Sequence, residues 1–162
     1  MESANKDFLE ILSQYQGIIH KVNLIYFRTD EDRKDNFQEV AYHLWKSFSS
    51  LKDMNKIGSW IYAVAINVSV SKIRKDSQYV PLEFVPDITH TDDIDKIENE
   101  MNFQQLIEAI RHLDEIDKSI MLLYLEEYSY NQIADTIGIS SLNVGVRINR
   151  AKKQLKHYLM SK

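Results

Sequence analysis

Apolar residues recur three and four positions apart along most of this chain, and that spacing limits the folds it can adopt. It places apolar side chains on one face of an α-helix, whereas a half-buried strand needs strict alternation, which is scarce here. The sequence therefore predicts an all-α protein. We expect helices over residues 7–26, 32–47, 59–75, 98–112, 117–126, 130–137 and 141–159.

Both prolines of the chain, Pro81 and Pro86, fall in one stretch without a clear helical period. Proline lacks a backbone N–H and its ring clashes with the preceding helical turn. We therefore predict a linker over residues 78–96 that separates two small helical domains, residues 1–77 and residues 97–162, the second with four helices. Domains of this size bury proportionally little surface, so help from a partner is expected.

The composition argues against several kinds of chemistry. The 162 residues include no cysteine and only four glycines, so there is no thiolate metal site and no glycine-rich phosphate loop. The five histidines are spread without metal-ligand spacing. We expect no catalytic residues, no metal, no cofactor and no enzymatic activity.

The first residues do not have the form of a secretory leader, and no apolar stretch approaches the roughly 20 residues that span a bilayer. We therefore expect a cytoplasmic protein with no membrane insertion.

The formal net charge is -4, but the charge is unevenly distributed. No acidic residue follows position 141, while acids cluster at residues 30–32 and 92–100. The basic residues of the C-terminal stretch are Arg147, Arg150, Lys152, Lys153, Lys156 and Lys162. A chain that is acidic overall but basic at one end is expected to have two kinds of partner.

Residues 129–159 have the pattern of a helix-turn-helix. Ser129 and Gln132 are spaced as a capping box, and Gly138 stands where a left-handed residue would end the first helix. A longer helix follows, and one of its faces carries the apolar residues Val144, Ile148, Ala151 and Leu155. Its polar side carries Asn143, Arg147, Asn149, Arg150, Lys153 and Lys156. Such an arrangement is typical of modules whose second helix reads the DNA major groove. The alternative is an ordinary helical hairpin with a solvated basic face.

The first half constrains function less. Its second helix has an outward side with Asp35, Gln38 and Glu39, and apolar residues available to pack: Phe37, Val40, Ala41, Leu44 and Trp45. Its third helix ends in Lys72, Arg74 and Lys75, which could simply complement the negative pole of the helix dipole. Among the aromatic residues, we expect a core position for Tyr15, Tyr26, Phe27 and Trp45, and leave Trp60 open.

Five short motifs follow one another in a distinctive order. They are residues 35–40 (DNFQEV) with 44–45 (LW), 59–62 (SWIY) with Ala65 and Asn67, 125–130 (LEEYSY) with Ile133 and Ala134, 138–140 (GIS), and Arg147 with Arg150 and Ala151. This order resembles the extracytoplasmic-function (ECF) group of the sigma-70 family of RNA polymerase sigma factors. The likeness covers residues 8–159.

The resemblance implies a role for each segment of the first domain, which would be sigma domain 2. In the family, the helix matching residues 32–47 docks on the clamp helices of core RNA polymerase, so Asp35, Gln38 and Glu39 are the implied polymerase contacts. The loop matching residues 51–58 captures an extruded base of the -10 element together with the asparagine matching Asn67. The implied -10 contacts are Leu51, Lys52, Asp53, Met54, Asn55, Lys56, Asn67, Lys72, Arg74 and Lys75.

The second domain would be sigma domain 4, which reads the -35 element. The implied contacts there are Ser141, Asn143, Arg147, Asn149, Arg150 and Lys153. The implied partners are core RNA polymerase, promoter DNA and an inhibitory anti-sigma factor. Ala63, Ile66 and Gly145 stand where relatives often have basic residues, so we expect weak binding of DNA by the free protein.

Two other functions remain open at this point. One is a stand-alone helix-turn-helix transcriptional regulator with a helical sensor or dimerisation domain, which would bind paired half-sites as a dimer. The other is an interaction protein that makes no DNA contact.

Overall fold

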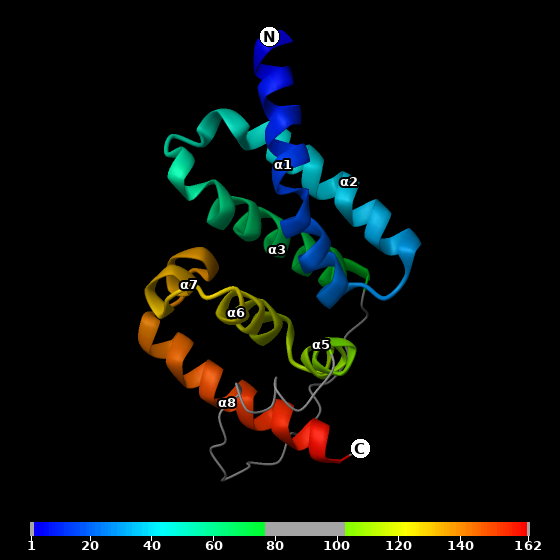
Figure 1. The fold of residues 1–162 in the computed structure, drawn as a ribbon, viewed down its shortest axis with the longest axis vertical. Coiled ribbons are helices and arrows are strands. Elements are labelled where there is room, and N and C mark those ends of the chain that lie inside the picture. Colours follow the sequence, from blue (N-terminus) through cyan, green and yellow to red (C-terminus); the bar gives the residue numbers. More distant parts are fainter. Residues whose placement is uncertain (1, 77–102, 162) are drawn as a thin grey trace. The chain divides into compact units, whose positions relative to one another are not determined.

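The computed structural model describes residues 2–76 and 103–161 (Figure 1). These residues form α-helices and two short 3-10 helices without any strand, which confirms the all-α class. They fall into two compact units, one on each side of residues 77–102. The predicted linker, residues 78–96, and the start of the helix predicted over 98–112 lie outside the described residues.

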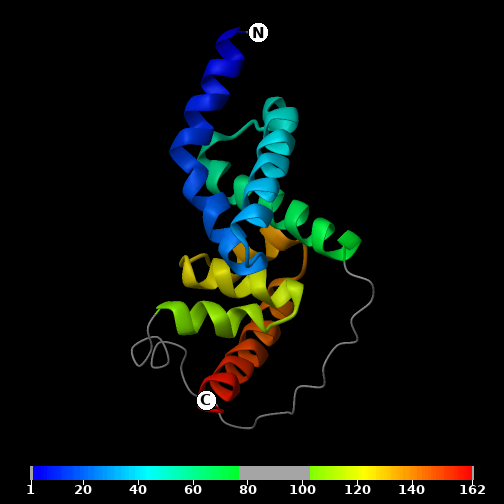
Figure 2. The same ribbon diagram turned by 90° about the vertical axis from the view of Figure 1, so that its right-hand side faces the viewer.

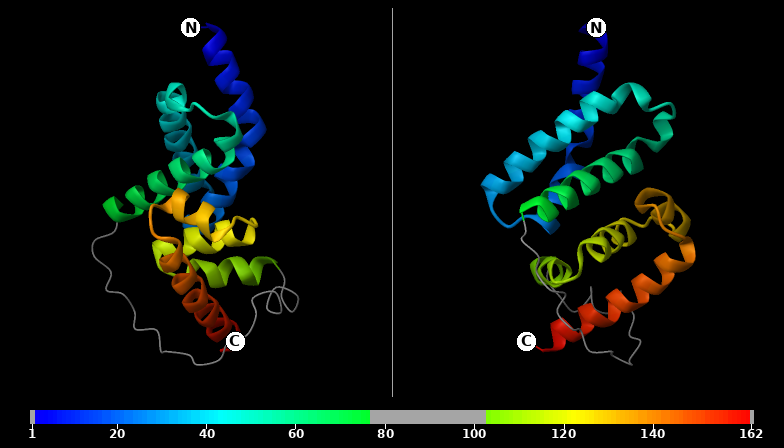
Figure 3. Two further views of the ribbon diagram at one scale, coloured as in Figure 1. Left: turned by 90° about the vertical axis from the view of Figure 1, so that its left-hand side faces the viewer. Right: turned by 180° about the vertical axis from the view of Figure 1, so that it is seen from behind.

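The N-terminal unit consists of α1 (Glu2–Tyr26), α2 (Asp30–Ser47) and α3 (Ile57–Asp76), which all pack against one another. Helices α2 and α3 run antiparallel and are joined by two 3-10 turns, η1 (Phe48–Ser50) and η2 (Met54–Lys56) (Figures 2 and 3). The most deeply buried apolar side chains of this unit include Ile19, Val22, Val40, Leu44, Ile61 and Ala65.

Helix α2 begins two residues earlier than predicted because its N-terminus is capped. The Thr29 hydroxyl accepts a hydrogen bond of 3.1 Å from the Asp32 backbone N–H, satisfying a donor that the helix leaves unpaired. Acidic residues fill the first turn, where they complement the positive end of the helix dipole. The acidic cluster at residues 30–32 is therefore a helix start.

A buried polar cluster connects the three helices of this unit. The Asn36 amide on α2 donates to the Asn23 side-chain oxygen on α1 at 2.7 Å and to the Ser69 hydroxyl on α3 at 2.9 Å. Asn23 in turn donates to the backbone oxygen of Arg33 at 3.1 Å. Because each buried polar group needs a specific partner, these bonds define the register between the helices.

The predicted core aromatics are only partly in the core. Tyr26 and Phe27 are buried, as predicted, and Tyr15 and Trp60 are half-buried. The prediction for Trp45 is wrong, because this residue is 52 % exposed and its indole N–H donates to the Asn5 side chain at 3.1 Å. Leu44, which was also expected to pack, is buried, and its neighbour Trp45 is turned outward because successive residues of an α-helix point in different directions.

The C-terminal unit consists of α5 (Phe103–Arg111), α6 (Glu115–Leu125), α7 (Tyr130–Ile137) and α8 (Ser141–Met160). Helix α8 is the longest and packs against the other three (Figure 1). Helix α6 begins earlier than predicted because the Asp114 carboxylate caps it, accepting a bond of 2.7 Å from the Asp117 N–H.

Candidate DNA and polymerase interfaces

Helix α7 is bounded by the two signals that the sequence predicts. The Ser129 hydroxyl accepts from the Gln132 N–H at 3.1 Å, and the Gln132 side chain accepts from the Ser129 N–H at 2.9 Å, so the capping box is confirmed. Gly138 ends the helix with φ 87°, and its N–H donates to the Ala134 carbonyl at 2.8 Å. The chain therefore turns sharply into α8.

Helix α8 is capped by the Ser140 hydroxyl, which accepts from the Asn143 N–H at 3.1 Å. One side of this helix is fully buried against the rest of the unit and consists of Val144, Ile148, Ala151 and Leu155. This is the apolar face predicted from the sequence. Much of the rest of α8 is exposed, and the helix carries no acidic residue.

The residues expected to read the -35 element do not all lie on that outer surface. Ser141, Asn143, Asn149 and Arg150 are exposed, and Lys153 is half-exposed. Arg147 is turned toward α6, where its Nη1 donates to the Asp117 carboxylate at 2.9 Å and lies 3.9 Å from that of Asp114. Its side chain is 23 % exposed, and its Nε is buried without a hydrogen-bond partner.

Asp117 on α6 is the residue of this site that sequence reasoning missed. Its side chain is 1 % exposed and binds both Arg147 and, at 3.6 Å, the Nη2 of Arg150. Burial and the nearby Asp114 carboxylate raise the pKa of Asp117, while the two arginines oppose that rise. The sequence did contain one signal for it. Asp117 shares a helix face with Ile120 and Met121, so an acidic residue occupies a position where the helical spacing of apolar residues predicts a core side chain.

Gly145 stands where a basic residue is common in the family that the motifs resemble. A Cβ at this position would lie 3.4 Å from the ring of Tyr130, the first residue of α7. That distance is an ordinary van der Waals contact, so the Tyr130 ring does not require a glycine here. The glycine leaves this part of α8 without a cation.

The segment expected to bind the -10 element is largely exposed. Lys52, Asp53, Met54, Asn55 and Lys56 are exposed, and Leu51 is half-buried. The Asp53 carboxylate caps η2 by accepting from the Asn55 N–H at 3.0 Å. The loop ends earlier than the predicted 51–58, because Ile57 is buried and already begins α3 together with Gly58.

The other residues expected at the -10 element lie farther along α3. Asn67 is exposed and follows Ile57 by ten residues, about 15 Å of helix rise. Lys72 is half-buried with its ammonium 5.8 Å from the centre of the Phe27 ring, a cation–π contact within the unit. Arg74 and Lys75 are exposed at the end of the helix.

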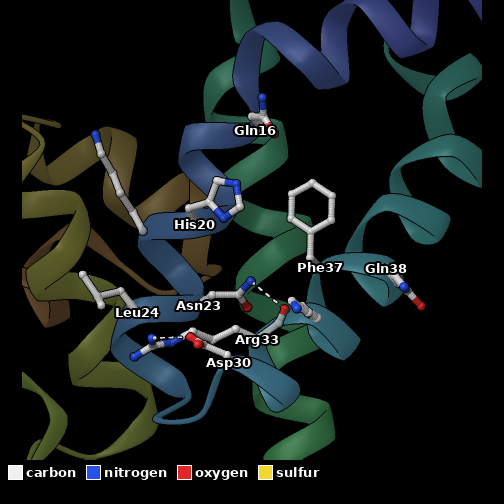
Figure 4. Close-up of a pocket in the computed structure, with 10 residues that line it drawn as sticks. Gln16, His20, Asn23, Leu24, Asp30, Arg33, Phe37 and Gln38 are labelled. Carbon is white, nitrogen blue, oxygen red and sulfur yellow. Dashed lines mark hydrogen bonds and ion pairs between the residues drawn. The ribbon is translucent and has the colours of Figure 1, made fainter.

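The expected polymerase contacts Asp35, Gln38 and Glu39 are exposed on α2. Gln38 borders a hollow of about 690 Å³ between α1 and α2, shown in Figure 4. His20 and Phe37 also line this hollow, with stacked rings whose centres are 5.2 Å apart. The exposed acidic side of α2 therefore lies beside a concave surface that is partly lined by aromatic rings.

Within residues 2–76 and 103–161, no helix is both long and apolar enough to cross a membrane. The same residues contain no cluster of three or more histidine or carboxylate side chains able to hold a metal ion.

Comparisons with known proteins cover the sequences of both units. Residues 103–155 match the family model "Sigma-70, region 4". The ECF RNA polymerase sigma-E factor of Haemophilus influenzae is 27 % identical, over 94 % of this chain and 87 % of that protein. The RNA polymerase sigma factor YlaC of Bacillus subtilis is 24 % identical, over 94 % of this chain and 92 % of its own length.

A solved structure has the same fold. The sigma factor RpoE of Bartonella quintana, crystallised with the anti-sigma factor NepR, superposes with a TM-score of 0.67 at 17 % identity. The match covers 99 % of this chain and 98 % of that one. The chain therefore contains a sigma-70 region 4 domain over residues 103–155, and along nearly its whole length it is similar to ECF sigma factors of the sigma-70 family.

Proposed function

We propose that this chain binds core RNA polymerase in the cytoplasm and directs transcription initiation, acting as a specificity factor without enzymatic activity of its own. Residues 1–77 would grip the polymerase and open the -10 element, and residues 97–162 would read the -35 element. The observation that carries the proposal is the extent of the likeness. Relatives named as sigma factors match 94 % of this chain, and therefore both units and not the helix-turn-helix alone.

The geometry of the C-terminal unit supports DNA reading by α8. The helix is braced on one side by α6 and α7, and its other side carries basic and amide side chains and no acid. Asn143, Asn149 and Arg150 are exposed and have the donors and acceptors that base edges require. Lys153 would meet phosphate, which positions the helix without specifying sequence.

Arg147 has a different role in this proposal from the one that the motif alone implied. Its guanidinium is already bound to Asp117, so it would act by holding α8 on α6. Arg150 is 52 % exposed at its side chain although it also lies beside Asp117. We therefore propose Arg150 as the arginine of this helix that meets DNA.

The N-terminal unit offers surfaces suited to the other two partners. The exposed acids Asp35 and Glu39 suit a basic surface on polymerase, with Gln38 adding hydrogen bonds. The exposed segment Lys52 to Lys56 and Asn67 would hold an unstacked base. Removing a base from the duplex costs a few kcal/mol, which contacts with these residues must offset.

A stand-alone regulator is less well supported. Such a protein would need only the helix-turn-helix in common with sigma factors, whereas the relatives also match the three-helix N-terminal unit. The two functions differ in one simple respect. A stand-alone regulator binds its site without polymerase, and a sigma factor with this net charge of -4 would bind poorly until it joins the polymerase.

We also propose an inhibitory anti-sigma partner that covers the polymerase-facing side of α2. The support is the neighbouring structure, in which a sigma factor is bound to an anti-sigma factor. Co-purification of the chain with such a partner, abolished by substitution of Gln38 and Glu39, would agree with this. Chain that is free and active under all growth conditions would contradict it.

In vitro transcription with purified core polymerase tests the main proposal. The chain should initiate at specific start sites on genomic DNA, Asn67→Ala should reduce open-complex formation, and Asn149→Ala should reduce promoter binding. Met160→Ala is the matched control, because Met160 is an exposed residue at the far end of α8. No initiation by the parent chain at any promoter would show that the proposal is wrong.

A further inference from the structure

Helix α8 has two exposed apolar side chains in its N-terminal half, which directly follows the turn of the helix-turn-helix. Leu142 is 79 % exposed and Val146 is 57 % exposed. They are four residues apart, so they lie one above the other on the same side of the helix. No sequence argument singled them out, because apolar residues of α8 were expected to face the core.

The helical period places these two residues in the middle of the proposed DNA-reading surface. Continuing from Val146 by three and then four residues leads to Asn149 and Lys153 on the same stripe. Val144 and Ile148, which are fully buried, lie on the opposite side of the helix. The stripe that faces away from the unit therefore begins with two apolar side chains and continues with an amide and an ammonium.

The surroundings of the pair indicate what it would contact. Asn143, Asn149 and Arg150 flank it, and α8 has no acid, so the surface complements an anionic partner. Phosphates alone would favour lysine or arginine at positions 142 and 146. The major groove of DNA offers one apolar feature at its base edges, the C5-methyl group of thymine.

We infer that Leu142 and Val146 are specificity-determining residues that pack against thymine methyl groups in the -35 element. Residues four apart are separated by about 6 Å along a helix, and neighbouring bases by about 3.4 Å. The two methyl groups therefore lie one or two base pairs apart. This inference rests on the proposed function, and it specifies which base chemistry this chain selects.

The test uses holoenzyme reconstituted from core polymerase and the full chain. Duplexes randomised over the -35 region are selected for binding, and each thymine of the selected site is then replaced singly by deoxyuridine. Deoxyuridine lacks only the C5-methyl group and keeps the same base pairing. Selection should enrich thymine at two positions, one or two base pairs apart. Removal of either methyl group should weaken binding about fourfold, the effect expected for one buried methyl-sized group.

Two variants identify which residue contacts which methyl group. Leu142→Ala should abolish the dependence on one methyl group, and Val146→Ala the dependence on the other. Met160→Ala, a matched loss of an exposed apolar side chain on the same helix, should keep both. All three positions are exposed, so circular dichroism should show unchanged helix content.

Several results would overturn the inference. One is equal affinity of the parent holoenzyme for thymine and deoxyuridine at every position of the selected site, a comparison that needs no variant. A second is selection of -35 sequences that contain no thymine. A third is that Leu142→Ala and Val146→Ala depend on the thymine methyl groups as strongly as the parent does. If the holoenzyme enriches no duplex at all, the proposed function itself is wrong and the inference is wrong with it.

Discussion

The Arg147 guanidinium on α8 donates a 2.9 Å hydrogen bond to the buried carboxylate of Asp117 on α6. The two residues are thirty positions apart in the sequence. Their bond connects α8 to α6, and Arg150 of α8 also lies 3.6 Å from the same carboxylate. A residue that the helix-turn-helix pattern assigns to DNA is thus part of the protein's own structure.

Arg147→Ala should destabilise the C-terminal unit by about 2 kcal/mol, because it leaves the Asp117 carboxylate buried with only a more distant arginine. Urea unfolding, followed by circular dichroism, measures this. Asn149→Ala is the control, because Asn149 is exposed on the same helix and its loss should weaken promoter binding without changing stability. A variant without Arg147 that unfolds at the same urea concentration as the parent would contradict the structural role.

The contribution of Asp117 to the stability of the C-terminal unit should fall as the pH rises. The pKa of Asp117 is raised in the folded state by burial and by Asp114, so the folded protein holds this proton more tightly than the unfolded chain does. The contribution is fully present below the unfolded pKa of about 3.9 and is lost as the pH rises through the folded pKa.

Comparison with Asp117→Asn isolates that effect, since every other carboxyl group is common to both proteins. The unfolding free energy of the parent minus that of the variant should decrease from pH 4 upward and then level off. A difference that stays constant with pH would show that the arginines fully offset burial, and one that increases with pH would show that they outweigh it; in either case the pKa of Asp117 would not be raised.

Asn36→Ala should destabilise the N-terminal unit by about 1–3 kcal/mol. It removes the donor to Asn23 and to Ser69 and leaves buried polar groups without their partner. Ser69→Ala should cost less, because Asn36 keeps its bond to Asn23. Glu39→Ala serves as control on the exposed side of α2, where stability should be unchanged but polymerase binding reduced. Equal stability of all three variants would contradict the proposed contribution of the buried cluster.

Two glycines should respond in opposite directions to replacement by alanine. Gly138 has φ 87°, where an L-residue is strained, so Gly138→Ala should cost about 1–2 kcal/mol although nothing crowds a Cβ there. Gly17 lies inside α1, also with open space, so Gly17→Ala should stabilise by about 0.5–1 kcal/mol. Thermal unfolding of both variants measures the two effects. A loss of stability in Gly17→Ala would show that this glycine has a role beyond the helix.

Much of the fold was predictable because it depends on local signals. The helix over Tyr130–Ile137 was predicted with correct ends, because Ser129, Gln132 and Gly138 each bond to a residue only three or four positions away. The starts of α2 and α6 were placed two residues late, because the caps at Thr29 and Asp114 were not recognised as such. Trp45 was expected in the core together with Leu44, but it is turned outward next to Leu44.

The candidate site was predictable only as a set of segments. The sequence by itself determined the helical class, the turn of the helix-turn-helix and the basic character of α8, because periodicity, caps and charge are properties of neighbouring residues. The tertiary structure decided which side chains of α8 are exposed for the proposed DNA contact. It binds Arg147 to Asp117 and exposes Leu142 and Val146, since those outcomes depend on how α8 packs against α6 and α7.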